Sequence, residues 1–226
     1  MNILIGVFNL YIDRWDFFSK LIVQHILLTL VSVVIIMAFG IVLGVTMTKN
    51  GMFAKIMLAI TNFLYTIPSI ALFGFLVIIT GIGNQSAVLA LVIYGLLPII
   101  RNTYVGIKEV DDQVIESAMG MGSTNMQLLF RVQLPLALPV IFAGIRIMVV
   151  MTISLCGIAS FIGAGGLGVA IWRGITTNFP EMTIAGSLLV ALLAIIADLI
   201  LGRIEYRAQK RILGVEMDKP LRTSTS

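Results

Sequence analysis

The sequence predicts an all-α integral membrane protein with five transmembrane helices. Of its 226 residues, 59% are hydrophobic and 12% carry charge, and the mean hydropathy of +1.07 is too high for a soluble domain. Two long stretches, residues 21–48 and 56–100, contain no Lys, Arg, Asp or Glu. A helical span needs about 20 apolar residues, so the second stretch can hold two spans.

The sequence predicts five spans in one transmembrane domain, with a short segment on either side of it. We place the spans at residues 22–47, 54–79, 87–107, 138–162 and 182–204. A polar, glycine-containing turn at residues 80–86 separates the second span from the third. The spans and their connections are expected to form a single transmembrane domain over residues 22–212. Residues 1–21 would form an extracytoplasmic N-terminal segment, and residues 213–226 a disordered cytoplasmic tail.

The distribution of Lys and Arg predicts the orientation of the chain. Of the 15 basic residues, Arg14, Lys20 and Arg173 fall on one side of the membrane and Arg146 falls within the fourth span. The other 11 fall on the opposite side, in the connections after the first and third spans and in the C-terminal region. Because basic residues accumulate on the cytoplasmic side, we expect the N-terminus outside and the C-terminus inside. An odd number of spans also places the two termini on opposite sides of the membrane.

Residues that could carry catalysis or bind a metal or nucleotide are few. The chain has one Cys, Cys156, and one His, His25, and for both we favour an ordinary packing role. No metal-ligand spacing and no phosphate-binding G-x-x-x-x-G-K-[ST] occurs. Residues 163–168 match G-x-G-x-x-G, but they follow a membrane span rather than a strand, so we interpret them as an outer turn. We expect no enzyme, no catalytic residue, no metal or cofactor on this chain, and no nucleic-acid partner.

The connection between the third and fourth spans, residues 110–135, is polar and rich in helix caps. Asp111 and Asp112 can begin a helix that Gly120 and Gly122 end in a left-handed turn. Residues 124–127 fit a capping box for a second short helix, whose continuation Pro135 disfavours. The sequence therefore predicts two short helices and a glycine turn on the cytoplasmic surface. An interfacial helix that only anchors the connection is the alternative.

This segment resembles the "EAA" signature of the permease subunits of binding-protein-dependent ABC importers. The matching elements are Glu116-Ser117-Ala118, then Gly122 after three residues, then VQLP at residues 132–135 after nine more. Ser117 and Val132 replace the usual alanine and isoleucine. The resemblance extends over residues 67–174, where IPSIALFGFL and FIGAGGLG are similar to the osmoprotectant branch, which imports glycine betaine, carnitine and choline. Methionine-importer permeases share part of the pattern.

The resemblance implies a type I ABC-importer fold in a bacterial cytoplasmic membrane. It implies a coupling helix that docks on an ATPase through Glu116, Ser117, Ala118, Gly122, Leu134 and Pro135. The implied partners are two ATP-binding subunits, which carry the ATP and Mg, a second permease copy or paralogue, an extracytoplasmic substrate-binding protein and the lipid bilayer. A methionine or other amino-acid permease is the alternative within this class, and an ion-coupled secondary transporter the alternative outside it.

Two charges and several aromatic residues within the spans are further candidates. Arg146 and Asp198 lie at similar depths, so they can pair, contact a neighbouring subunit or face the inner vestibule. Snorkelling of Arg146 to the cytoplasmic surface is the alternative. A quaternary ammonium ion is recognised by aromatic faces. The candidates along a translocation path, with ordinary packing as the alternative, are Tyr65, Phe73, Phe75, Tyr94 and Phe161.

Overall fold

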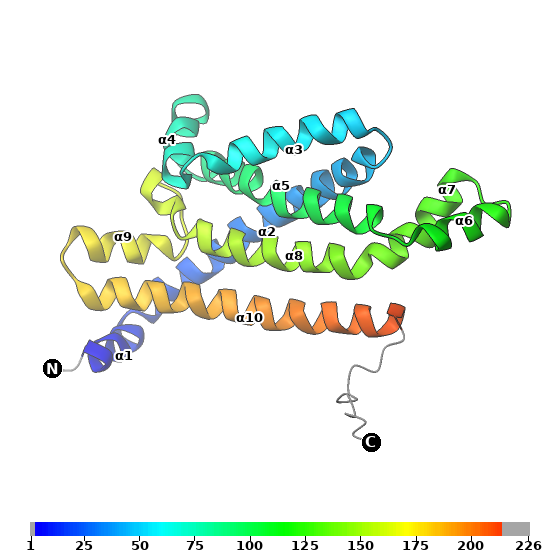
Figure 1. Ribbon diagram of the computed structural model, residues 1–226. Coiled ribbons are helices and arrows are strands. Elements are labelled where there is room, and N and C mark those ends of the chain that lie inside the picture. Colours follow the sequence, from blue (N-terminus) through cyan, green and yellow to red (C-terminus); the bar gives the residue numbers. More distant parts are fainter. Residues whose placement is uncertain (1–2, 214–226) are drawn as a thin grey trace, which may run out of the picture.

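The computed structural model describes residues 3–213, which form a bundle of long helices (Figure 1). The predicted tail lies outside these residues except for Leu213. The elements are α1 (Ile3–Asp13), α2 (Trp15–Met47), α3 (Gly51–Thr66), α4 (Ser69–Thr80), α5 (Asn84–Lys108), α6 (Asp112–Gly120), α7 (Asn125–Leu128), a π-helical turn η1 (Leu129–Gln133), α8 (Leu134–Cys156), a 3₁₀ turn η2 (Ala159–Ile162), α9 (Gly168–Thr176) and α10 (Pro180–Leu213).

Four stretches of helix are long and apolar enough to cross a membrane. They are α2, α5, the run from α7 through α8, and α10. The second predicted span, residues 54–79, is not one straight helix: α3 and α4 meet at an angle of 100°. Pro68 causes the break, because a proline pushes the preceding residue out of the helical region, and Ile67 is extended at φ −71° and ψ 127°. Counted as one bent span, this pair brings the total to five.

The core of the bundle lies where α2, α5 and α8 cross. Ile36, Ile99 and Met148, one from each helix, are fully buried. Small residues allow the helices to approach closely, since a Cβ on Gly40 of α2 would overlap the side chain of Ile99. A Cβ on Gly95 of α5 would overlap Ile36 in the same way. Helix α10 covers α8 on the outside of this core.

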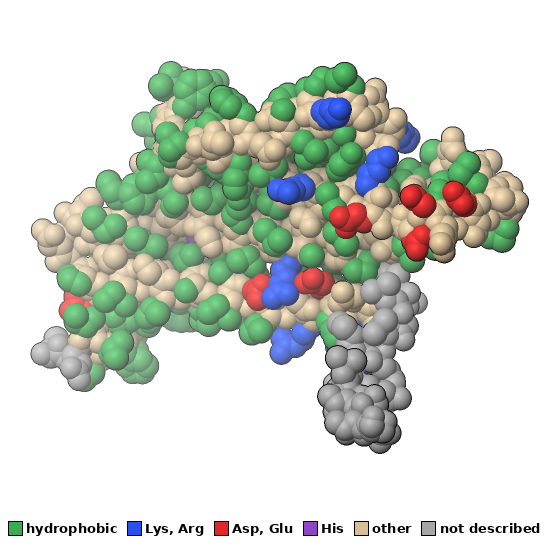
Figure 2. Space-filling model, in the orientation of Figure 1, with side chains coloured by type: hydrophobic (Ala, Val, Ile, Leu, Met, Phe, Trp, Pro, Cys, Tyr) green, Lys and Arg blue, Asp and Glu red, His purple; other side chains and the backbone are tan. Residues whose placement is uncertain are grey.

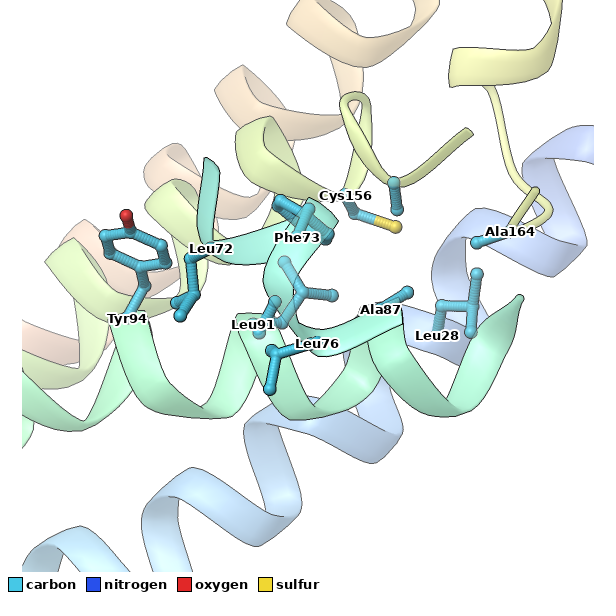
Figure 3. Packing of buried hydrophobic residues seen from close by; sticks show 11 residues of the cluster. Leu28, Leu72, Phe73, Leu76, Ala87, Leu91, Tyr94, Cys156 and Ala164 are labelled. Carbon is cyan, nitrogen blue, oxygen red and sulfur yellow. The ribbon is translucent and has the colours of Figure 1, made fainter. Parts of the chain in front are cut away.

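A second apolar cluster holds the bent α4 against α5. Figure 3 shows Leu72, Phe73 and Leu76 of α4 packed over Ala87 and Leu91. Cys156, at the end of α8, is buried in the same cluster as a free thiol. Burial among apolar side chains is the packing role expected for this cysteine.

The N-terminal residues also pack on the bundle. Helix α1 buries Val7 and Leu10 against Phe18 of α2 and Met182 of α10, and the Tyr11 hydroxyl donates to the carbonyl of Ala185 at 2.8 Å. Helix α2 begins at Trp15, seven residues before the predicted span.

The connections gather at the two ends of the bundle (Figure 1). At one end the α4–α5 turn touches the end of η2, where the Gly83 N–H donates to the carbonyl of Ile162 at 3.0 Å. Helix α1 and the α9–α10 turn lie at this end too. Helices α6 and α7 project from the opposite end, where α10 finishes.

Candidate functional site

Helix α6 is bounded by the residues that the sequence indicated. The Asp111 carboxylate accepts the N–H of Gln113 at 2.8 Å and caps its start. At its end the N–H groups of Gly122 and Ser123 donate to the carbonyls of Met119 and Ala118, the bonding pattern of a Schellman motif. Gly122 has φ +86°, so this residue makes the left-handed turn, whereas Gly120 is helical.

The second half of the segment is more continuous than the sequence suggested. Thr124 and Gln127 form a capping box that begins α7, with bonds of 2.9 and 3.3 Å. The expectation that Pro135 ends this helix is wrong, because α7 passes through η1 directly into α8. The wider π-helical turn lies just before Pro135, where a proline has no N–H for an ordinary helical bond. Residues 110–135, called the coupling segment below, are therefore joined to a membrane helix without a loop.

The surface of the coupling segment is both polar and apolar. Glu116 and Ser117 are exposed, with the Ser117 hydroxyl bonded to the carbonyl of Gln113, while Ala118 is 4% exposed and packs inward. Leu134 and Pro135 are half-buried in the first turn of α8. Several large hydrophobic side chains are exposed around the glycine turn, and sequence reasoning missed them: Val114, Met119, Met121, Met126 and Phe130. Unbranched methionines suit a surface that adapts to a protein partner.

Arg146 and Asp198 lie together, as one of the sequence hypotheses proposed. The Arg146 guanidinium donates two bonds to the Asp198 carboxylate, of 2.6 and 2.8 Å. A third bond of 3.1 Å goes to Glu205, which sequence reasoning missed. Asp198, Gly202 and Glu205 are spaced at i, i+4 and i+7 on α10, so they share one face, and that spacing was the available signal. Gly202 makes room for the guanidinium, since a Cβ there would stand 3.1 Å from its Cζ atom.

A cavity of about 580 Å³, open to the surface of the chain, borders these charges between α8 and α10. Its walls combine the three charged side chains with an apolar strip of α8 made of Ala143, Ile147, Val150 and Met151. Figure 2 shows this group of acidic and basic side chains within a largely hydrophobic surface over α10.

The five aromatic candidates are spread over α3, α4, α5 and η2. Tyr65 and Tyr94 do meet, edge to face at 5.8 Å between ring centroids, and the Tyr65 hydroxyl contacts the Met151 sulfur at 2.9 Å. Phe73 is buried in the α4–α5 cluster, and Phe75 is exposed on α4. Phe161 lies in η2, where its ring packs on Trp172 at 4.5 Å.

His25 packs inside the bundle and holds the loop between η2 and α9 in place. Its Nε2 lies 3.0 Å from the carbonyl oxygen of Ile153, and its Nδ1 accepts the N–H of Leu167 at 3.3 Å. Side-chain oxygens of Gln24 and Asn84 accept the N–H groups of Gly166 and Gly165. The G-x-G-x-x-G residues thus form a turn held by three side chains of α2 and α5. Within residues 3–213, no three His, Cys, Asp or Glu side chains converge on a metal position.

The sequence pattern of a known family matches this chain. The family is described as "binding-protein-dependent transport system inner membrane component", and it matches residues 36–210. The chain belongs to this family. It is the permease subunit of an ABC importer and an inner membrane protein, and its role is transport rather than catalysis.

Curated relatives of the permease include named importer subunits. A carnitine transport permease protein (OpuCB) of Listeria monocytogenes is 38% identical over 88% of each chain. A glycine betaine/carnitine/choline permease protein (OpuCD) of Bacillus subtilis is 41% identical over 80% of each chain. An ergothioneine transport permease/ergothioneine binding protein (EgtU) of Helicobacter pylori is 46% identical over 73% of the permease. The permease spans 30% of the length of that last protein.

Solved structures share the fold of the permease. A chain of the MetNI methionine ABC transporter, in an inward-facing conformation, superposes with a TM-score of 0.75. The match covers 86% of the permease and 97% of that chain at 24% identity. The helical arrangement is therefore that of a type I ABC-importer permease, as the sequence resemblance implied.

Proposed function

We propose that the permease imports small solutes that carry a quaternary ammonium group. The named relatives support this, because carnitine, glycine betaine, choline and ergothioneine all contain a trimethylated, permanently positive nitrogen. The methionine transporter is 24% identical and supports the fold alone. The solute would cross by alternating access, in which a path opens first to one side of the membrane and then to the other.

The proposed topology has five spans, with the N-terminus outside and the C-terminus inside. In this arrangement α3 and α4 together make one bent crossing. The coupling segment lies at one end of the bundle with the end of α10, and the α4–α5 turn lies at the other (Figure 1). The 11 basic residues assigned to the cytoplasmic side lie in the C-terminal region and at the end of the bundle that carries the coupling segment. Because basic residues accumulate on the cytoplasmic side, this end would face the cytoplasm.

The proposed energy input comes from outside this chain. Two ATP-binding subunits would hold ATP and Mg, a second permease copy or paralogue would complete the path, and a substrate-binding protein would deliver the solute. No enzymatic step is assigned to the permease itself. Glu116 and Ser117 would make polar contacts with the ATPase, while the exposed methionines around Gly122 would fill a cleft on it. Ala118 packs inward and holds α6 in place.

The observation that carries the proposed coupling is the unbroken helix from α7 to α8. Because η1 connects them without a loop, a displacement of α7 by an ATPase would move Leu134, Pro135 and the membrane part of α8 with it. This is a mechanical link between the cytoplasmic segment and the spans.

Uptake into proteoliposomes tests the proposed function. The permease would be reconstituted with its ATPase and binding protein, and radiolabelled choline, glycine betaine and methionine would be supplied in turn. We expect ATP-dependent uptake of the two quaternary ammonium compounds and not of methionine. Methionine uptake with neither of the others would reject the proposed substrate class. Uptake driven by an ion gradient without the ATPase would reject the proposed energy source.

A further inference from the structure

The cavity between α8 and α10 carries more negative than positive charge. Arg146 is the single cation on its wall, and two carboxylates, Asp198 and Glu205, face it. The guanidinium bonds both oxygens of Asp198 but only one oxygen, Oε2, of Glu205. The cluster therefore holds two carboxylates for one guanidinium, and the Oε1 oxygen of Glu205 is outside the bonds to Arg146.

Charged groups at membrane depth are costly, so they usually pair or face a solute pathway, and here two carboxylates share one guanidinium. The cavity gives Glu205 access to a mobile cation. We infer that this cavity binds the quaternary ammonium group of the solute inside the permease. This inference rests on the proposed function, and it assigns one location within the chain to the positive end of the substrate.

The apolar wall matches a trimethylated nitrogen better than a metal ion or a simple ammonium. A quaternary ammonium group has no N–H to donate, so its methyl groups need apolar contacts rather than acceptors. Ile147, Val150 and Met151 line the same cavity and provide such contacts. A volume of about 580 Å³ is in the range of small-molecule sites and exceeds what a bare ion requires.

Aromatic rings adjoin the same wall. Met151 lines the cavity and also contacts the Tyr65 hydroxyl, and Tyr65 packs edge to face on Tyr94. The negative faces of aromatic rings attract quaternary ammonium groups. The exposed ring of Tyr65, beside Met151, can therefore offer a second surface to the same cation, whereas Tyr94 is buried behind it.

Gly202 sets the position of the positive charge in the site. Because it has no Cβ, the guanidinium lies against α10 between Asp198 and Glu205, one turn from each. In this position Arg146 can also donate hydrogen bonds to a solute carboxylate, which carnitine and glycine betaine would present. Choline, which has no carboxylate, would contact only the carboxylates and the apolar wall.

Binding of choline to the permease–ATPase complex, without the binding protein, tests the inference. The complex would be held in lipid nanodiscs, and saturation-transfer NMR would detect the choline methyl protons. The uncharged carbon analogue 3,3-dimethylbutan-1-ol is the matched probe. We expect choline to bind and the analogue to bind at least about tenfold more weakly. The variant E205Q should weaken choline binding by a similar factor, which corresponds to about 1.4 kcal/mol.

Two further variants make the test specific. E109Q removes an exposed carboxylate outside the cavity and should bind choline as the native protein does. V150F fills the cavity without changing a charge and should abolish binding, which provides a test if E205Q fails to assemble. Equal binding of choline and its analogue, or native binding by V150F, would overturn the inference. Import of choline by the complete transporter, combined with either result, would overturn this site while leaving the proposed function standing.

Discussion

His25 in α2 lies 3.0 Å, through Nε2, from the carbonyl oxygen of Ile153 in α8, a residue 128 positions away. That carbonyl has lost its usual partner because α8 ends here, and the Gly157 N–H bonds Ser154 instead. The peptide N–H of Leu167 points at Nδ1, which must therefore accept, so the network assigns the ring proton to Nε2. One neutral imidazole thus joins α2, the end of α8 and the loop between η2 and α9.

Replacing this imidazole should destabilise the fold. H25A would leave the buried Ile153 carbonyl and Leu167 N–H without partners, at a cost of about 1–3 kcal/mol for each orphaned group. I26A, which removes an exposed side chain from the next position of α2, is the control. Thermal unfolding of the purified permease in detergent should show a clear loss for H25A alone. Equal melting temperatures of the two variants would contradict the role assigned to His25.

The pairing of Arg146 with Asp198 predicts a specific pattern of charge reversals. R146D brings three carboxylates together, and D198R brings two cations together, so each single variant should yield less folded protein. The double variant restores opposite charges across α8 and α10 and should recover part of the loss. R203D reverses an exposed charge on α10 and should behave as the native chain does. Size-exclusion chromatography after detergent extraction measures the folded fraction. A double variant no better than either single one would exclude the pair.

The close contact between α9 and the end of α8 depends on Gly168. A Cβ at this position would overlap the carbonyl oxygen of Gly157 and lie 2.7 Å from the Ser160 hydroxyl. Since two backbone segments meet here, G168A should cost about 1–3 kcal/mol through overpacking. G51A, where a Cβ would meet nothing within 4 Å, is the matched control. Denaturation under the same conditions should show a lower free energy of unfolding for G168A than for G51A. Similar stability of the two variants would show that the contact can relax.

The proposed topology can be read from the labelling of single cysteines. M121C lies in the coupling segment, where the native residue is 82% exposed, and T177C lies in the exposed α9–α10 turn. In intact cells an impermeant maleimide should label T177C and not M121C, and permeabilised cells should label both. The native Cys156 is fully buried and should contribute little background. Labelling of M121C in intact cells would reverse the orientation.

Local signals predicted the coupling segment well. The Asp111 cap, the left-handed Gly122 turn and the Thr124–Gln127 capping box each depend on residues within a few positions of one another. The prediction failed at Pro135, which a π-helical turn accommodates within a continuous helix. Pro98 and Pro139 likewise lie inside helices, so a proline alone does not mark a boundary.

Features that depend on distant residues could not be predicted in the same way. The break at Pro68 is completed by the Tyr94 hydroxyl, which donates to the Ile67 carbonyl from another helix. The bonds of His25 and the third member of the Arg146 cluster also require helices to be placed side by side. The five aromatic candidates were chosen by residue type alone. The fold packs Tyr65 on Tyr94 and buries Tyr94 and Phe73 in one cluster, whereas Phe75 is exposed and Phe161 packs on Trp172.

Transfer of motion through the coupling segment is the central claim, and uptake by G122V tests it most directly. Valine at φ +86° is strained by about 1–2 kcal/mol, so the turn between α6 and α7 should change its conformation and the ATPase should meet the two helices in a wrong orientation. Because a Cβ at this position would touch no other atom, the variant should still insert and fold. G120A changes a helical glycine in equally open space two residues away. In proteoliposomes with ATPase and binding protein, we predict that ATP-driven choline uptake by G122V is at least about tenfold slower than native uptake. A tenfold change corresponds to about 1.4 kcal/mol, which is within the expected strain of the valine. Uptake by G120A should equal native uptake. Native uptake by a correctly inserted G122V would contradict the account.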